Sequence, residues 1–241
     1  MNKTISVLFA TTIFTAPVFA DQLRVVVDIP PVHGIVEGVL GSNASITTLI
    51  GSGIDPHNYT MKPSHAAAVS EADLIVLIGE ALTLSLAEKL PSLASNANII
   101  ELAEVPNVHL IAYEDAHEEH EDDAHHDDEH HADHQDHNHD ADHEDHNGHN
   151  HSGVDPHMWL DIDNAHVWAH EIAKAASRLS PALTSDINAN LAAFEQALVG
   201  LKSEMQTLTA KPYSVSHDAF GYLEESFGID HPQAVTNAMG L

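Results

Sequence analysis

The chain has 241 residues, with 37 acidic side chains against eight lysines and arginines and a formal net charge of −29. A charge of this sign disfavours nucleic acid and anionic membrane surfaces as partners, and it favours cations. The chain contains no cysteine, which excludes disulfide bonds and zinc sites built from thiolates. Any bound metal ion must therefore be held by histidine, aspartate, glutamate or water.

Residues 1–20 predict a secretory signal peptide. A short positively charged start precedes the apolar residues 5–14, and Val18 and Ala20 occupy the recognised positions of a cleavage site. The apolar stretch is too short to span a membrane. The mature chain is therefore expected to begin near Asp21 and to be soluble outside the cytoplasm.

Residues 21–113 predict an N-terminal α/β lobe. Short apolar, β-branched runs alternate here with segments whose apolar residues recur at helical spacing. Strands and helices that alternate in this way are typical of a parallel sheet covered by helices. Strands are expected at 23–28, 45–50, 73–79 and 98–102, and helices at 31–40, 64–71 and 82–90.

Residues 114–152 have a different composition. There are thirteen histidines between His117 and His151, and sixteen acidic residues but no lysine or arginine between Glu114 and Asp145. Such a segment cannot bury enough apolar surface to offset the entropy of ordering it, so we expect a disordered loop. Imidazole mixed with carboxylate offers many ligands for borderline divalent cations, zinc above all. We predict a metal-binding loop; the alternative is a solvated acidic spacer whose histidines are incidental.

The remaining residues predict the end of the first lobe and the start of a second. Residues 153–180 are expected to complete the N-terminal lobe with a helix capped by Asp163 or Asn164. Residues 181–210 predict the longest helix of the chain, which at about 1.5 Å per residue could join two lobes. Residues 211–241 predict a strand and a helix of a partial C-terminal α/β lobe. The apolar residues on one face of the long helix are Leu183, Ile187, Leu191, Phe194, Leu198 and Leu201.

The sequence Asp-Pro-His occurs twice, at residues 55–57 and 155–157. Proline fixes the backbone just before each histidine, which predicts an oriented imidazole. His57 and His217 both follow predicted strands, and parallel sheets place their ligands at such positions. Three imidazoles from separate segments, His57, His157 and His217, make a suitable set of zinc ligands. We therefore predict a zinc site; the alternative is that these are ordinary loop or helix-cap histidines.

The fourth position of this site is left for water or for a carboxylate such as Asp55 or Asp218. Another pair, His166 and His170, lies four residues apart on a predicted helix and would share one face. Because no glutamate stands beside His166 in the pattern of zinc proteases, a solvated helix face is the favoured interpretation of this pair.

Several segments together resemble a known family: residues 53–59, 62–64, 71–76, 155–160 and 216–222. Their sequences and order are similar to those of the periplasmic zinc-binding proteins of high-affinity zinc ABC importers. The acidic, His-rich insert before the second histidine motif resembles the one that marks the zinc branch of these proteins rather than the manganese branch.

The resemblance implies two α/β lobes joined by a long rigid helix, with the metal held in the cleft by His57, His157 and His217. It also implies a periplasmic monomer that binds Zn²⁺ as a transported ligand and delivers it to a membrane permease driven by a cytoplasmic ATPase. Members of the family continue for longer than this chain, so the second lobe is expected to be incomplete.

Three other functions are compatible with the same residues. A zinc-buffering protein would bind zinc without docking to a permease, and a zinc hydrolase would also use three histidines and an open position. A manganese-importer component is a near relative, although imidazole-rich ligation favours zinc. No general base stands beside a predicted ligand in a known pattern, so we expect zinc capture for import and no catalysis.

Overall fold

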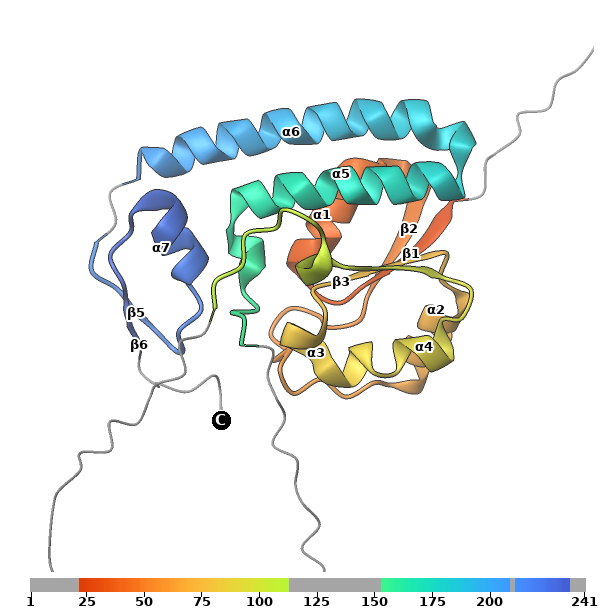
Figure 1. Ribbon diagram of the computed structural model, residues 1–241, viewed down its shortest axis with the longest axis horizontal. Coiled ribbons are helices and arrows are strands. Elements are labelled where there is room, and N and C mark those ends of the chain that lie inside the picture. Colours follow the sequence, from red (N-terminus) through yellow and green to blue (C-terminus); the bar gives the residue numbers. More distant parts are fainter. Residues whose placement is uncertain (1–21, 113–152, 209–210, 235–241) are drawn as a thin grey trace, which may run out of the picture.

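The computed structural model describes residues 22–112, 153–208 and 211–234 (Figure 1). The predicted signal peptide, residues 1–20, and the predicted His-rich loop, residues 114–152, lie outside the described residues. Within the described part, no helix combines the length and the apolar character that a membrane span requires. The helices are α1 (Pro30–Leu40), α2 (Pro63–Glu71), α3 (Glu80–Ala87), α4 (Leu90–Leu93), α5 (Ile162–Leu179), α6 (Thr184–Gln206) and α7 (Gly221–Phe227). The strands are β1 (Leu23–Val27), β2 (Ala44–Thr48), β3 (Leu74–Leu77), β4 (Asn98–Glu101), β5 (Ser214–Val215) and β6 (Gln233–Ala234).

Four parallel strands, in the order β2-β1-β3-β4, form the main sheet. The central strands β1 and β3 are the apolar runs expected of strands that are covered on both faces, and every residue of β3 is buried. The register places Val25 of β1 beside Ile46 of β2 and beside Leu74 of β3. The predicted parallel sheet covered by helices is confirmed.

Helices cover both faces of this sheet (Figure 1). Helices α1, α5 and α6 pack against one another on one side, and α2, α3 and α4 lie on the other. The indole of Trp168, on α5, is fully buried and donates a hydrogen bond from Nε1 to the carbonyl oxygen of Leu102 at 2.9 Å. The large ring therefore fills the core while its polar atom has a partner.

Helix α6 runs along one side of the molecule, from the end of α5 to the region of α7 (Figure 1). Its 23 residues correspond to a length of about 35 Å. On its predicted apolar face, Ile187 and Leu198 are buried, whereas Leu201 is 46% exposed. A Cβ atom added to Gly38 of α1 would lie 2.4 Å from Cδ2 of Phe194 on α6, so a larger residue at this position would force the ring of Phe194 to move.

Two predicted helix boundaries are wrong. In place of the single predicted helix 82–90, the chain forms α3 and the short α4. Pro91 lies in the first turn of α4, where proline is favoured, so a second helix begins here. Helix α5 is capped by Asp161, whose carboxylate accepts a hydrogen bond from the amide of Asp163 at 2.8 Å, and not by Asp163 or Asn164.

The segment 211–234 contains β5, α7 and β6, and it is the described part of the predicted second lobe. Strands β5 and β6 pair in parallel. Gly228 ends α7 with φ of 61°, a left-handed conformation that glycine adopts without strain. In Figure 1 this segment lies beside the first lobe, near the C-terminal end of α6.

Asp28 joins the ends of β1 and β3. Its carboxylate is buried and accepts hydrogen bonds from the amides of Ile29 at 2.8 Å and of Ile78 at 2.7 Å. Burial raises the pKa of Asp28 to about 7, although the two amide hydrogen bonds act in the opposite direction. The folded protein therefore binds this proton more tightly than the unfolded chain does.

Replacing Asp28 by asparagine is expected to alter the pH dependence of stability. The Asp28 carboxyl has an ordinary pKa of 3.8 and a folded-state pKa of about 7. Its stabilising contribution to the free energy of unfolding is therefore fully present below pH 3.8 and is lost as the pH rises to about 7. The unfolding free energy of the wild type, relative to Asp28→Asn, should fall by roughly 3 kcal/mol between about pH 4 and pH 7. Urea unfolding at a series of pH values measures this difference, and a constant difference would contradict a raised pKa.

Candidate metal centre

The structure brings His57, His157 and His217 together from three segments of the chain. One ring nitrogen from each lies within 4.8 Å of the other two. The Nε2 atoms of His157 and His217 are 3.4 Å apart, and the ring centroids of His57 and His157 are 5.6 Å apart. Zinc binds imidazole nitrogen at about 2.0–2.1 Å, so two ligands of one tetrahedral ion lie about 3.3 Å from each other. His157 and His217 already have that spacing.

Each Asp-Pro-His sequence forms the same local turn. The carboxylate of Asp55 accepts a hydrogen bond from the amide of His57 at 3.0 Å, and the carboxylate of Asp155 accepts one from the amide of His157 at 2.9 Å. In such Asx turns a short side chain fixes the backbone two residues further on. The aspartate and the proline together therefore fix the backbone conformation at each histidine.

His157 is the most constrained of the three. It is 4% exposed, and its Nδ1 lies 2.7 Å from Oδ1 of Asp155. A hydrogen bond donated from Nδ1 to this carboxylate leaves Nε2 facing the other two histidines, and zinc-binding histidines are commonly oriented in this way. The ring of Trp159 meets that of His157 edge-on, with centroids 5.3 Å apart, and covers one side of the site.

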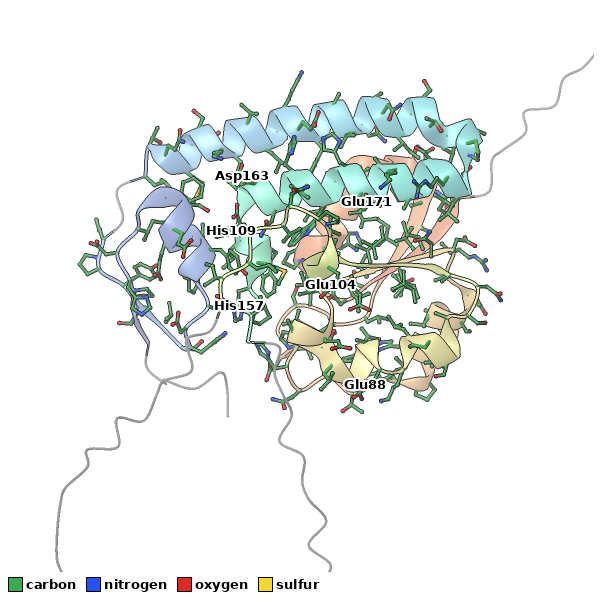
Figure 2. The ribbon with its side chains drawn as sticks, in the orientation of Figure 1. Glu88, Glu104, His109, His157, Asp163 and Glu171 are labelled. Atoms are coloured by element: carbon green, nitrogen blue, oxygen red, sulfur yellow. The ribbon has the colours of Figure 1, made fainter. Side chains whose placement is uncertain are left out.

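The histidines lie in an open cleft of about 840 Å³. The cleft gives a hydrated ion access from solvent, while its apolar walls strengthen electrostatic attraction inside it. Figure 2 places His157 between the first lobe and the α7 segment. The residues that line the cleft come from three parts of the chain: Gly53, Ile54, Asp55, Pro56, His57, His157, Trp159, Leu160, Ser216, His217, Ala219 and Phe220.

Neither carboxylate considered for the fourth position joins the three histidines. Among the described residues, the group of ligand atoms in the cleft consists of histidine alone, and Asp218 belongs to a separate group. Asp55 accepts hydrogen bonds from the amide of His57 and from the side chain of Asn58, the latter at 2.8 Å. Partial burial acts to raise the pKa of Asp55, but these bonds and the nearby imidazoles hold it below its ordinary value. Within the described part of the chain, neither carboxylate is therefore placed as a fourth ligand.

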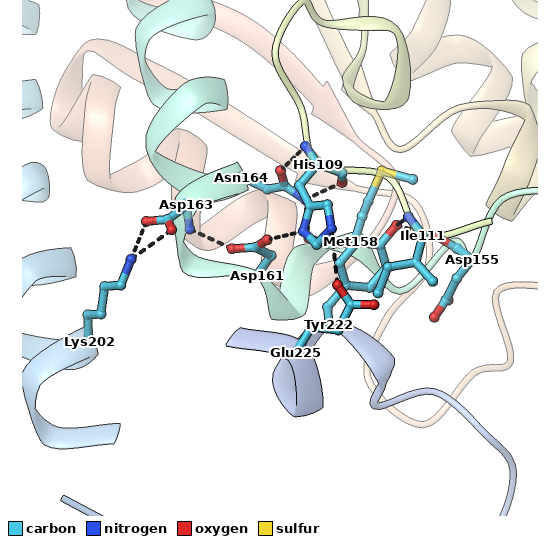
Figure 3. A network of polar contacts seen from close by, with 10 residues as sticks. All are labelled: His109, Ile111, Asp155, Met158, Asp161, Asp163, Asn164, Lys202, Tyr222 and Glu225. Carbon is cyan, nitrogen blue, oxygen red and sulfur yellow. Dashed lines mark hydrogen bonds and ion pairs between the residues drawn. The ribbon is translucent and has the colours of Figure 1, made fainter. Parts of the chain in front are cut away.

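Tyr222 connects α7 to the turn that carries His157 (Figure 3). Its side chain is fully buried, and its hydroxyl donates to the carbonyl oxygen of Asp155 and accepts from the amide of Ile111, each at 3.0 Å. Burial raises the pKa of Tyr222 to about 12, so the hydroxyl keeps its proton at any physiological pH. The hydroxyl therefore ties the second lobe to the backbone of the metal centre.

His109 extends this network (Figure 3). Its Nδ1 lies 2.8 Å from Oδ2 of Asp161, and its Nε2 lies 3.3 Å from Oε2 of Glu225 on α7. Its amide and carbonyl oxygen both bond to the side chain of Asn164, at 2.7 and 3.0 Å. Asp161 and Asn164 follow it by 52 and 55 residues, so no local sequence pattern indicates these contacts.

Comparison with known proteins identifies relatives over almost the whole chain. The model of a family described as zinc-uptake complex component A, periplasmic, matches residues 25–239. The high-affinity zinc uptake system protein ZnuA of Paracoccus denitrificans is 39% identical over 242 residues, covering 98% of this chain and 74% of that protein. The protein of the same name from Yersinia pestis is 28% identical over 229 residues, covering 93% of this chain and 69% of that protein.

Solved structures share the fold. A crystal structure of ZnuA matches with a TM-score of 0.69 at 24% identity, covering 91% of this chain and 72% of that one. The periplasmic zinc-binding protein TroA from Treponema pallidum matches with a TM-score of 0.66 at 22% identity, covering 92% of this chain and 70% of that one. Because the family model and the Paracoccus denitrificans relative match nearly all of the sequence, this chain belongs to the family of periplasmic A components of zinc-uptake complexes.

Proposed function

We propose that this chain captures Zn²⁺ in the periplasm and delivers it to the membrane permease of an ABC importer. The observation that carries the proposal is the meeting of three imidazoles in one open cleft. Two of them, His57 and His157, come from the first lobe, and His217 comes from the segment that leads to α7. The names of the relatives as zinc-uptake proteins support the same cargo.

The ligands select the cargo by their chemical type. Imidazole suits zinc, whereas manganese prefers carboxylate, carbonyl and water oxygens. Within the described residues the ligand group in the cleft is made only of histidine, which favours a zinc importer over a manganese importer. His157, buried and oriented by Asp155, is the ligand that needs the least rearrangement to bind.

Release follows from the division of the ligands between two lobes. If the α7 segment moves away from the first lobe, His217 leaves an ion that His57 and His157 still hold. Loss of one ligand weakens a metal site by at least about tenfold. Movement of one lobe at the permease is therefore sufficient to convert capture into delivery, and no covalent step is required.

The residues around the site do not favour hydrolysis. A zinc hydrolase needs a general base within reach of the metal-bound water, and the carboxylate of Asp55 is already engaged by two hydrogen bonds. We infer that the chain is a binding protein and not an enzyme, and that it acts as a monomer. The signal peptide at residues 1–20 and the metal-binding loop at residues 114–152 remain predictions.

A zinc titration with a competing chelator tests the site. Ala112 and Val154 form an antiparallel bridge, so deleting residues 114–151 joins two ends that already lie side by side. In this shortened chain at neutral pH we expect one tight site, which His217→Ala weakens by at least about tenfold because one of three ligands is lost. His33→Ala removes a histidine of α1 that contacts Thr48 and belongs to none of the groups of ligand atoms among the described residues, so it should leave the affinity unchanged. Equal affinity of the His217→Ala variant and its parent would contradict the cleft site.

Growth of bacteria tests delivery. The test uses a strain that lacks its own zinc-binding importer component, grown in zinc-poor medium. The full chain should restore growth. His217→Ala should not, because the permease receives zinc only from the cleft. Periplasmic zinc that accumulates without restored growth would identify a zinc buffer instead.

Tyr222→Phe tests the link between the lobes. The change leaves the amide of Ile111 and the carbonyl oxygen of Asp155 without their partner, at a cost of about 1–3 kcal/mol. We expect a lower melting temperature and weaker zinc binding, because the segment that carries His217 is held less firmly. Tyr213→Phe, a change of the same kind at a less buried tyrosine of that segment, is the control. If the two variants bind zinc equally well, Tyr222 has no positioning role.

A further inference from the structure

A second group of metal-ligand types lies between α5 and α6. His166 and His170 are four residues apart on α5 and share one face, and Glu195 approaches them from α6. Oε1 of Glu195 lies 3.1 Å from Nε2 of His166 and 2.7 Å from Nε2 of His170. The glutamate that is absent beside His166 would be a general base, whereas Glu195 brings a carboxylate of the neighbouring helix to the two imidazoles. The interpretation of this pair as a plain solvated helix face is incomplete.

The geometry of this group suits a divalent cation. Nε2 of both imidazoles lies close to the same oxygen of Glu195, and the three ligand atoms all lie within 4.8 Å of one another. An ion that binds nitrogen and oxygen at about 2.0–2.2 Å separates its tetrahedral ligands by about 3.3 Å. The two rings need to move only slightly apart from the carboxylate to admit it. Two imidazoles and one carboxylate are also a recurrent zinc ligand set.

The surroundings allow an ion to enter and to stay bound. The three side chains are 50%, 53% and 32% exposed, so an ion can arrive from solvent and keep water at its remaining positions. Lys202 of α6 pairs with Asp163 of α5 at 2.7 Å, an exposed ion pair between the same two helices (Figure 3). Lys174 pairs with Glu171 at 2.7 Å. Both lysines therefore have a carboxylate partner, which reduces their repulsion of a cation.

We propose that His166, His170 and Glu195 form a second site, for a divalent cation of the zinc class, on the outside of the first lobe. The site is separate from the cleft, since none of the three cleft histidines belongs to it. A bound ion holds α6, the helix that leads to the second lobe, against α5. Its ligands are more exposed than the buried His157, so it binds zinc more weakly than the cleft and fills only when zinc is abundant.

The test uses the full chain from Asp21, with ¹⁵N-labelled histidine and Zn²⁺ alone as the probe. Imidazole nitrogen signals report individual rings, so His166 and His170 are followed separately from the other histidines once their signals are assigned. His166→Ala and His170→Ala assign the two signals. We expect both Nε2 signals to move together as zinc is added, and to do so equally in His57→Ala. A response that disappears in His57→Ala would assign the effect to the cleft and overturn the second site.

Two glutamate variants on α6 provide the matched comparison. Glu195→Gln retains the size of the side chain but loses its charge, and it should raise the zinc concentration at half-response by at least about tenfold. Glu204→Gln, at an exposed position of the same helix, should leave that concentration unchanged. If the two imidazole signals do not change when zinc is added, or if they change at the same zinc concentration in Glu195→Gln as in the wild type, the three residues form only an interhelical hydrogen bond.

Hydrogen exchange supplies an independent readout. Zinc should slow amide exchange in α6 of the wild type at least threefold, and this slowing should be absent in His170→Ala. His33→Ala, which removes a histidine of α1 that contacts Thr48, should retain the slowing. Unchanged exchange in wild-type α6 at zinc concentrations that move the two imidazole signals would overturn the claim that the ion holds the helices together.

Discussion

The parallel direction of the main sheet is the constraint on which the metal centre depends. Parallel strands end at one edge, so the segments that follow β1 and β2 emerge beside each other. Asp28 follows β1 and bonds to the amide beyond β3, and the turn with His57 lies in the loop after β2. The segments before and after residues 113–152 lie side by side, since the amide of Asp155 donates a hydrogen bond to the carbonyl oxygen of Ile111 at 2.8 Å. This pairing brings His157 to the same place.

Asp155 couples the orientation of a ligand to the docking of the second lobe. Its carboxylate contacts both the amide and the ring of His157, while its backbone carbonyl accepts the hydroxyl of Tyr222. A buried polar group left without a partner costs about 1–3 kcal/mol. Displacing α7 therefore breaks both hydrogen bonds of the Tyr222 hydroxyl, which water must replace, at the same time as it withdraws His217.

The sequence was sufficient for those features whose causes are local. Buried parallel strands such as β1 and β3 appear as short apolar runs, and an Asx turn with proline acts within three residues, so the strands and both Asp-Pro-His turns could be predicted. The partner of Tyr222 could not, because Asp155 lies 67 residues away. Glu195 meets His166 and His170 only after α5 and α6 have packed, and the register of two helices is set by their side chains together rather than by the period of either one.

The two groups of histidines differ most in burial, and this difference determines what each can do. In the cleft, His157 is 4% exposed and its ring is fixed by a carboxylate, so zinc binding at the proposed site requires little further ordering of this side chain. The group on α5 and α6 is half-exposed, and an ion there exchanges readily with the solution. In the proposed mechanism the cargo is released by moving the lobes apart, and α6 is the helix that leads from one lobe to the other. An ion that holds α6 against α5 opposes any opening that shifts α6, so the weaker site can restrain release when zinc is plentiful without competing for the cargo itself.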